Sequence, residues 1–307
     1  MIDALRLIPI FVLLPFLVAA QTQDPPFSLP DSVELRRDVV YARYGDRAMK
    51  ADLFLPKSGE GPFPAVVYIH GGGWKSGSKA AFQRQAAFMA TQGFVGICIE
   101  MRLSGEAQFP APIHDAKAAV RYLRAEAKAL RVDASRIGAA GGSSGGHVAA
   151  MLAVTAGQAE YEGQGGSPGF SSTVQAVALF NPAVDLVSFG ERVQANATNS
   201  VAAFLGESYK ANPGLWKKAT PITYVSAQSP PMLFLHGDSD KTVPIAQPRK
   251  MEAALKAAGV RADFMVAPGA DHAFFNRPPW FEPTLKRMAG FFASTLQTSS
   301  VPSHSGR

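Results

Sequence analysis

The segment Ile137–His147 constrains the fold of this chain more than any other stretch. It reads IGAAGGSSGGH, with apolar residues at its start and a second apolar run directly after it. Glycines around a serine allow a backbone turn too tight for side chains, and such a turn joins a β-strand directly to an α-helix. A flexible Gly–Ser loop would not be flanked by apolar segments on both sides. The segment therefore predicts a strand–turn–helix unit that exposes a serine hydroxyl at the edge of a sheet.

Apolar and amphipathic segments alternate along the rest of the 307 residues, of which 47% are hydrophobic and 18% charged. Continuous apolar strands separated by helices are typical of a mostly parallel sheet with helices on both faces, so we expect an α/β fold. The expected strands are Ala65–Ile69, Phe94–Glu100, Ile137–Ala140, Val174–Phe180, Met232–Leu235 and Ala262–Val266. The expected helices are Lys79–Thr91, Ile113–Leu130, Gly146–Ala156, Ile245–Ala258 and Glu282–Leu296.

Two segments depart from this alternation. Leu35–Tyr44 and Met49–Leu55 are expected to form a β-hairpin that leads into the sheet. Asp185–Gln228 contains only short helical pieces, and we expect it to form a small helical cap over one end of the sheet. Together these assignments define one domain at residues 34–297, with the cap insertion at 185–228.

The two ends of the chain differ in composition from this domain. Residues 1–20 combine a charged start, a short apolar run and small residues at its end, the pattern of a cleaved secretory signal peptide. We therefore expect a secreted or periplasmic protein with no integral membrane segment in the mature chain; an uncleaved N-terminal anchor is the alternative. Residues 21–33 contain three prolines and are interpreted as a linker, and residues 298–307 as a disordered tail.

The charges and the cysteine exclude several kinds of partner and site. The formal net charge is +6, but Lys and Arg are scattered and form no dense run, so we expect no nucleic-acid partner. The single cysteine, Cys98, lies in an apolar stretch and is expected to be a buried core residue rather than a nucleophile. The oligomeric state is unknown from the sequence.

The glycine–serine turn fits the pattern Gly-x-Ser-x-Gly in two frames, centred on Ser143 or on Ser144. In the first frame the residue three positions after the serine is Gly146, which allows the new helix to pack closely on the strand. In the second frame that residue is the bulky His147. We therefore assign Ser143 as the nucleophile. It is expected at the N-terminus of a helix, whose dipole favours developing negative charge.

The segment HGGGW at residues 70–74 directly follows a predicted strand. Acyl transfer passes through a tetrahedral oxyanion, which needs fixed N–H donors, and glycines let the main chain approach the substrate closely. We assign the amides of Gly72 and Gly73 to this oxyanion hole, with the amide of Ser144 as the third donor. His70 is expected to brace the loop rather than to act as a base.

An acid and a base follow the last two predicted strands. Asp238 and Asp240 both come after Met232–Leu235. We assign Asp240 as the acid that orients the base, with Asp238 forming the turn. His272 follows the last strand and is assigned as the general base. The resulting chain order of serine, aspartate and histidine is the order typical of a sheet-edge serine site of this kind.

These motifs resemble those of the α/β hydrolases, and more closely those of their esterase branch with an HGGGW loop. Over about residues 35–295 the chain is similar to the bifunctional feruloyl and acetyl-xylan esterases and to the hormone-sensitive-lipase-like esterases. The family pattern Gly-x-Ser-Ala-Gly-Gly-His supports the Ser143 frame, with Ser144 here where alanine is usual. The resemblance also rests on RLSGE at 102–106, FPA at 109–111, IHD at 113–115, AAVR at 118–121 and HGDSDKTVP at 236–244.

The residues and the resemblance together predict an α/β-hydrolase fold and a serine carboxyl-ester hydrolase. It would act through an acyl-enzyme on short-chain esters, such as acetyl or feruloyl esters of plant polysaccharide. Its partner would be a small-molecule or carbohydrate ester, and the chemistry needs no metal or organic cofactor. A lipase, an amidase or peptidase, and a non-catalytic binding protein are the alternatives. Four aromatic residues are candidates for the substrate pocket or, alternatively, for the core: Trp74, Phe109, Phe274 and Phe275.

Overall fold

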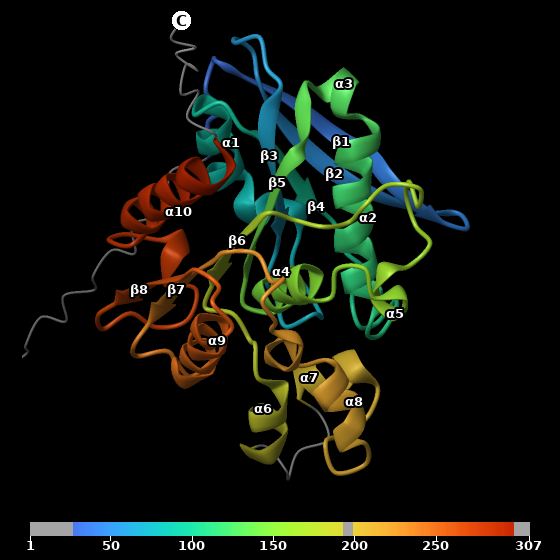
Figure 1. Ribbon diagram of the computed structural model, residues 1–307, viewed down its shortest axis with the longest axis vertical. Coiled ribbons are helices and arrows are strands. Elements are labelled where there is room, and N and C mark those ends of the chain that lie inside the picture. Colours follow the sequence, from blue (N-terminus) through green and yellow to red (C-terminus); the bar gives the residue numbers. More distant parts are fainter. Residues whose placement is uncertain (1–26, 193–198, 298–307) are drawn as a thin grey trace, which may run out of the picture.

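The computed structural model describes residues 27–192 and 199–297, which surround a central eight-stranded sheet (Figure 1). The strand order is β1-β2-β4-β3-β5-β6-β7-β8. β2 pairs antiparallel with β1 and with β4, and all other neighbouring strands pair parallel. This confirms the predicted fold class. The strands are β1 (Val33–Tyr44), β2 (Arg47–Pro56), β3 (Phe63–Ile69), β4 (Val95–Ile99), β5 (Val132–Gly142), β6 (Ala176–Phe180), β7 (Met232–Gly237) and β8 (Ala262–Ala267).

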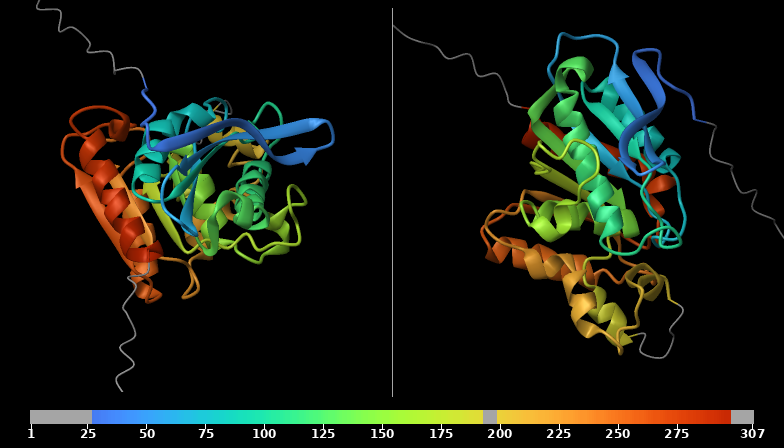
Figure 2. Two further views of the ribbon diagram at one scale, coloured as in Figure 1. Left: turned by 90° about the horizontal axis from the view of Figure 1, so that it is seen from above. Right: turned by 90° about the vertical axis from the view of Figure 1, so that its right-hand side faces the viewer.

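Helices cover both faces of the sheet (Figures 1 and 2). Because successive side chains of a strand point to opposite faces, β3 contributes to two cores. Val67 and Ile69 pack in the core that also holds residues of α2, α4 and α9, whereas Val66 and Tyr68 pack with α1 and α10. Cys98 lies in this second core, as expected. The five helices are α1 (Gln83–Thr91), α2 (Ala111–Ala125), α4 (Ser144–Val154), α9 (Ala246–Ala257) and α10 (Phe281–Leu296).

Three of the expected helices differ clearly from the observed ones, and the other two differ by one residue at one end or at both. The first helix is divided into η1 (Lys79–Phe82) and α1. The second is divided into α2 and α3 (Ala127–Leu130) at Glu126, whose backbone at φ −94° and ψ 14° departs from helical geometry. α4 begins at Ser144 rather than at Gly146 because β5 continues to Gly142 and only one residue separates the two elements.

In its described residues, 185–192 and 199–228, the segment expected to form the cap has four short helical elements, which gather beyond one end of the sheet (Figure 1). Phe204 and Trp216 are its largest fully buried side chains, and Phe204 belongs to the core beneath α4. The segment is therefore packed on the main domain by its own aromatic residues. Its elements are α6 (Leu186–Arg192), α7 (Ser200–Leu205), α8 (Pro213–Lys218) and η2 (Pro221–Tyr224).

The remaining helical elements are α5 (Ala159–Glu162) and η3 (Phe274–Asn276). The expected signal peptide, residues 1–20, and the expected tail, residues 298–307, lie outside the described residues. In the part of the chain that the structure describes, no helix has both the length and the apolar character needed to cross a bilayer.

Candidate active site

Ser143 stands alone between β5 and α4, with φ 54° and ψ −119°. A non-glycine residue in this region is strained by roughly 1–3 kcal/mol and persists only when its surroundings enforce it. Here the enforcement comes from two glycines. A Cβ atom on Gly145 would lie 2.3 Å from the Ile69 carbonyl oxygen, and one on Gly141 would lie 2.3 Å from the Gly145 carbonyl oxygen. The sharp turn predicted from the sequence is therefore present, with Ser143 at its apex.

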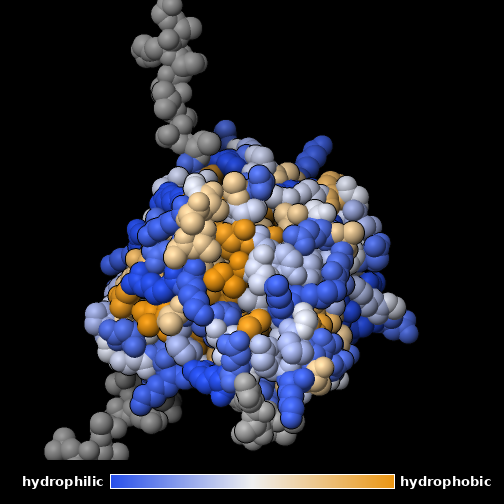
Figure 3. Space-filling model, turned by 60° about the horizontal axis from the view of Figure 1, so that its bottom comes forward, coloured by the Kyte–Doolittle hydropathy of each residue, from blue (hydrophilic) through white to orange (hydrophobic). Residues whose placement is uncertain are grey.

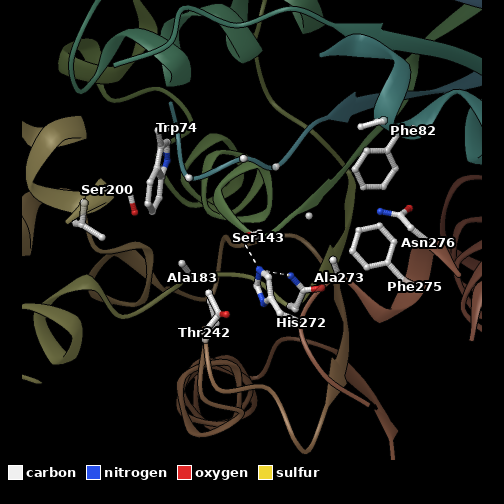
Figure 4. A pocket seen from close by; sticks show the side chains of 18 of the residues that line it. Trp74, Phe82, Ser143, Ala183, Ser200, Thr242, His272, Ala273, Phe275 and Asn276 are labelled. Carbon is white, nitrogen blue, oxygen red and sulfur yellow. Dashed lines mark hydrogen bonds between the residues drawn. The ribbon is translucent and has the colours of Figure 1, made fainter. Parts of the chain in front are cut away.

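The three residues assigned from sequence as nucleophile, base and acid lie each within hydrogen-bond distance of the next, and Figure 4 shows Ser143 and His272 of this set. Ser143 Oγ lies 2.9 Å from His272 Nε2, and His272 Nδ1 lies 2.7 Å from Asp240 Oδ2. They come from the β5–α4 turn and from the loops after β8 and β7. With its Nδ1 proton donated to Asp240, the neutral His272 ring presents the lone pair of Nε2 to the Ser143 hydroxyl, as a general base requires.

The carboxylate of Asp240 is held ionised by its hydrogen bonds. Its side chain is fully buried, and Oδ1 accepts the amide N–H groups of Thr242 at 2.8 Å and Val243 at 2.9 Å. Burial by itself would raise the pKa of Asp240, but the hydrogen bonds from His272 and the Val243 amide outweigh it, so the pKa lies below its usual value. Asp238 is exposed, and its carboxylate accepts the Gly269 amide at 2.7 Å. Asp238 therefore fixes the turn, and Asp240 alone of the two reaches His272.

The glycine loop after β3 lies directly against the Ser143 turn. A Cβ on Gly71 would stand 2.9 Å from the Gly142 carbonyl oxygen. Gly72 and Gly73 have φ of 120° and 63°, values that favour glycine. The N–H groups of Gly72, Gly73 and Ser144 donate no hydrogen bond within the described residues. Three free amides beside one serine are what an oxyanion hole requires, and they remain our proposed donors.

His70 takes no part in this constellation. Its Nδ1 donates to the carbonyl of the neighbouring Gly71 at 2.8 Å. Its side chain is not among those that line the cavity beside Ser143. Burial lowers the pKa of His70, which keeps the ring neutral in this position. The geometry is that of a residue bracing the loop.

A cavity of about 450 Å³ opens beside Ser143 (Figure 4). Of the four aromatic candidates, Trp74 and Phe275 line it. Phe82 of η1 adds a ring stacked on Phe275, with ring centroids 5.6 Å apart. The cap contributes Phe189 and Val201. Figure 3 shows apolar surface gathered in the middle of the face at the cap end of the molecule, ringed by hydrophilic side chains.

The other two aromatic candidates are not among the residues that line this cavity, and their packing agrees with the alternative that they belong to the core. Phe109 packs against the rings of Tyr161 and Phe204, with centroids 6.0 and 5.8 Å away. Phe274 is 1% exposed and lies edge-on to Trp280, in the core beneath α10. Phe109 contacts rings of α5 and α7, which are distant in the sequence, whereas Phe274 contacts the nearby Trp280.

Phe82 and Asn181 are among the residues of the site that were missed from the sequence. Phe82 is the last residue of η1, the helical segment after the glycine loop, and it lines the same cavity as Ser143. Asn181 directly follows β6, is fully buried, and places its Nδ2 3.3 Å from His272 Nε2. Asn181 could have been predicted as a site residue because it is a polar residue directly after a buried parallel strand, and ligand sites of such sheets lie at the carboxyl ends of the strands.

A buried histidine connects the glycine loop to the cap. Trp74 Nε1 donates to His147 Nδ1 at 3.3 Å, and His147 Nε2 donates to the Ala219 carbonyl at 2.7 Å. The Trp74 ring also stacks on Phe204 of α7, with centroids 4.8 Å apart. Burial lowers the pKa of His147 to about 4, so the ring is neutral at neutral pH and can accept from Trp74. Across residues 27–192 and 199–297, no three His, Cys, Asp or Glu side chains gather to fit a metal ion.

Solved structures similar to this one include esterases. A truncated carbohydrate esterase from gut microbiota superposes with a TM-score of 0.78 at 31% identity, covering 86% of this chain and 97% of that one. The esterase Est2 of the planctomycete Thermogutta terrifontis gives a TM-score of 0.72 at 30% identity, covering 86% of this chain and 92% of Est2. Est2 has also been solved with propionate bound and phosphorylated by paraoxon.

Curated relatives carry esterase names as well. Esterase LipQ of Mycobacterium tuberculosis (strain ATCC 25618 / H37Rv) is 33% identical over 217 residues, which cover 69% of this chain and 50% of LipQ. Esterase LipC of the same strain is 30% identical over 254 residues, or 78% of this chain and 60% of LipC. The chain thus spans about half the length of these relatives. The family model BD-FAE matches residues 51–255, most of the chain, and the chain accordingly belongs to the BD-FAE family of α/β hydrolases.

Proposed function

We propose that this protein is a carboxyl-ester hydrolase that works through an acyl-enzyme on Ser143. The observation that carries the proposal is the chain of contacts from Ser143 Oγ through His272 to Asp240, at 2.9 and 2.7 Å, built on a serine with strained backbone. Three free amides beside that serine and the esterase names of the similar proteins support it.

The proposed reaction has two halves. In the first, Ser143 Oγ attacks the ester carbonyl carbon while its proton passes to His272 Nε2, and Asp240 stabilises the imidazolium. The three amides receive the oxyanion; the bond to the alcohol then breaks, and the alcohol leaves with the proton from His272. In the second, water attacks the acyl carbon and gives a proton to His272. The bond to Ser143 Oγ breaks, the proton returns to that oxygen, and the carboxylic acid departs.

The proposed substrates are short-chain esters with a bulky, carbohydrate-like alcohol group. The rings of Trp74, Phe82 and Phe275 wall the cavity close to Ser143, which would limit the length of an acyl chain. The helices that the structure describes in the cap are all short, so we expect the alcohol side to stay open to a sugar polymer. A carbohydrate esterase and a propionate-bound esterase among the similar structures agree with this class.

A panel of substrates tests this proposal. The panel contains p-nitrophenyl esters of increasing acyl length, acetylated xylan and methyl ferulate. We expect kcat/KM on the p-nitrophenyl esters to fall steeply from acetyl and butyryl to dodecanoyl. Measurable release of acetate from the xylan is expected. Strong hydrolysis of long-chain triglycerides with none of acetylated carbohydrate would instead indicate a lipase, and faster cleavage of amides than of esters an amidase.

Covalent labelling tests the nucleophile separately. Paraoxon should inactivate the enzyme with one phosphoryl group per chain, located on the peptide that carries Ser143, since the organophosphate reacts with an activated serine. Mass spectrometry of the digested protein gives the modified residue. Labelling of another residue, or turnover that survives full labelling, would contradict the acyl-enzyme mechanism.

A further inference from the structure

We infer that Asn181 is a positioning residue for the base, and that its side-chain amide holds His272 in the tautomer whose Nε2 lone pair faces Ser143. The inference rests on the proposed function, in which Ser143 and His272 are the reacting pair. Asn181 belongs to none of the sequence motifs and takes no part in the proposed transfer of the acyl group.

Two donors converge on one nitrogen of His272. Ser143 Oγ lies 2.9 Å from Nε2, and Asn181 Nδ2 lies 3.3 Å from the same atom. On the other side of the ring, Nδ1 is 2.7 Å from the Asp240 carboxylate, which can only accept. A ring with its proton on Nδ1 is compatible with all three contacts, because Nδ1 donates to Asp240 and the single lone pair of Nε2 is shared by the two donors. A ring protonated at Nε2 would instead place N–H against N–H at Asn181.

The backbone of Asn181 supports a specific role for its side chain. Its φ is 37°, in the left-handed region where glycine is the usual residue, and its amide N–H is fixed by the Leu235 carbonyl at 2.8 Å. The side chain is fully buried, yet its Oδ1 has no hydrogen-bond partner within the described residues. Glycine would relieve both the strain and the unpaired oxygen. The contact from Nδ2 to His272 is the interaction that glycine would lose.

The amide would also distinguish the two nitrogens of the ring. A proton on Nε2 would face the positive end of the Asn181 N–H dipole, so the contact favours a lone pair at that atom until the proton of Ser143 is transferred to it. Other titratable groups lie around His272, and they are the same in the native protein and in variants of Asn181. Asp240 faces it from the loop after β7, with the buried His236 at 3.4 Å behind that carboxylate, and Asp271 is paired with Arg277 on its own loop.

Two substitutions at this position separate the amide from the backbone. Asn181→Gly removes the side chain and suits the positive φ. Asn181→Asp keeps the shape but replaces the N–H donor by an acceptor, which would hold a proton on Nε2. We expect Asn181→Gly to lower kcat/KM on p-nitrophenyl acetate by about tenfold and to leave KM within about twofold. In both variants the acid limb of kcat/KM against pH should move to higher pH, by about one unit or more in Asn181→Asp.

A matched control makes the same chemical change elsewhere. Asn212 caps α8, its Oδ1 accepting the Leu215 amide, and Asp is an equally good cap. Asn212→Asp should leave the acid limb in place. If Asn181→Asp does not fold, Asn181→Gly decides alone.

The tautomer itself is visible without turnover. The nitrogen-15 chemical shifts of His272 in the resting enzyme at neutral pH should show a protonated Nδ1 and an unprotonated Nε2, and Asn181→Asp should shift the proton to Nε2. An acid limb and a tautomer unmoved in the Asn181 variants would overturn the inference and leave Asn181 a packing residue. Failure of the proposed function would appear differently, as Ser143→Ala with undiminished activity.

Discussion

At the scale of single residues, the two adjacent serines of the turn have opposite environments. Ser143 Oγ contacts His272, whereas Ser144 Oγ is buried without a hydrogen-bond partner in the described part of the chain. The proposed contribution of Ser144 comes from its backbone amide, which every residue except proline has. The side chain at 144 is therefore dispensable for the chemistry, although the motif alone fits both serines.

The first prediction concerns these serines. Ser143→Ala should lower kcat on p-nitrophenyl acetate by several orders of magnitude. Ser144→Ala should keep most of the activity and raise the free energy of unfolding by about 1 kcal/mol, since an unpaired buried hydroxyl is lost. Steady-state kinetics and urea unfolding measure the two effects. If Ser144→Ala is folded but inactive, the nucleophile is Ser144 and the frame centred on Ser143 is wrong.

The second prediction concerns the two aspartates after β7. Asp240→Asn should leave the protein folded but slow kcat by roughly a thousandfold or more, because the amide no longer enforces the proton on His272 Nδ1. Asp238→Asn should be mild, since that exposed carboxylate contacts only its own turn and the Gly269 amide. Comparison of kcat and melting temperature for the pair checks this; the reverse ranking would contradict the assigned acid.

At the scale of elements, the strand–turn–helix unit depends on close approach between backbones. The third prediction compares two glycines in helices. A Cβ on Gly145 would lie 2.3 and 2.4 Å from the carbonyl oxygens of Ile69 and His70, and neither oxygen can move without displacing β3. A Cβ on Gly290 in α10 meets nothing within 4 Å.

Gly145→Ala should therefore abolish activity and lower the melting temperature, whereas Gly290→Ala should stabilise the protein by about 0.5–1 kcal/mol through helix propensity. Thermal unfolding and p-nitrophenyl acetate hydrolysis of both variants give the comparison. A fully active Gly145→Ala enzyme would show that the turn can open, and that the close contact at Gly145 does not enforce the strained backbone of Ser143.

At the scale of the whole molecule, the buried His147 joins the glycine loop, α4 and the cap. The fourth prediction follows from its pKa of about 4 in the folded protein, against about 6.5 in the unfolded chain. Between these values the unfolded chain binds the proton more tightly, so stability falls as pH falls. This group should remove about 3 kcal/mol from the free energy of unfolding between pH 6.5 and 4, and nothing more below.

Urea unfolding at several pH values measures this loss in the native protein and in His147→Gln. The variant should be less stable at neutral pH, because the bonds to Trp74 and Ala219 are weakened, but its stability should fall less steeply with acid. The other buried histidines contribute equally to the pH dependence of stability in both proteins, so their contribution cancels when the two curves are subtracted. Parallel curves would show that His147 does not carry the acid sensitivity.

The sequence by itself determined the fold class, the turn around Ser143 and the positions of the base and the glycine loop. These features are local. A backbone that must pass close to another backbone needs glycine at particular positions, and a buried parallel strand must be apolar throughout, so both requirements appear directly in the residues. Ser143, Asp240 and His272 could be assigned together because each follows a buried strand, and polar residues after such strands meet at one edge of the sheet.

Only the tertiary structure decided which side chains complete the site. Phe82 faces the cavity while Phe109 and Phe274 turn into the core, although all three lie near site segments in the sequence. Asn181 contacts His272 across 91 positions of chain. The physical reason is that a side chain's direction depends on which distant elements leave room for it, and packing between such elements has no signature in the local pattern.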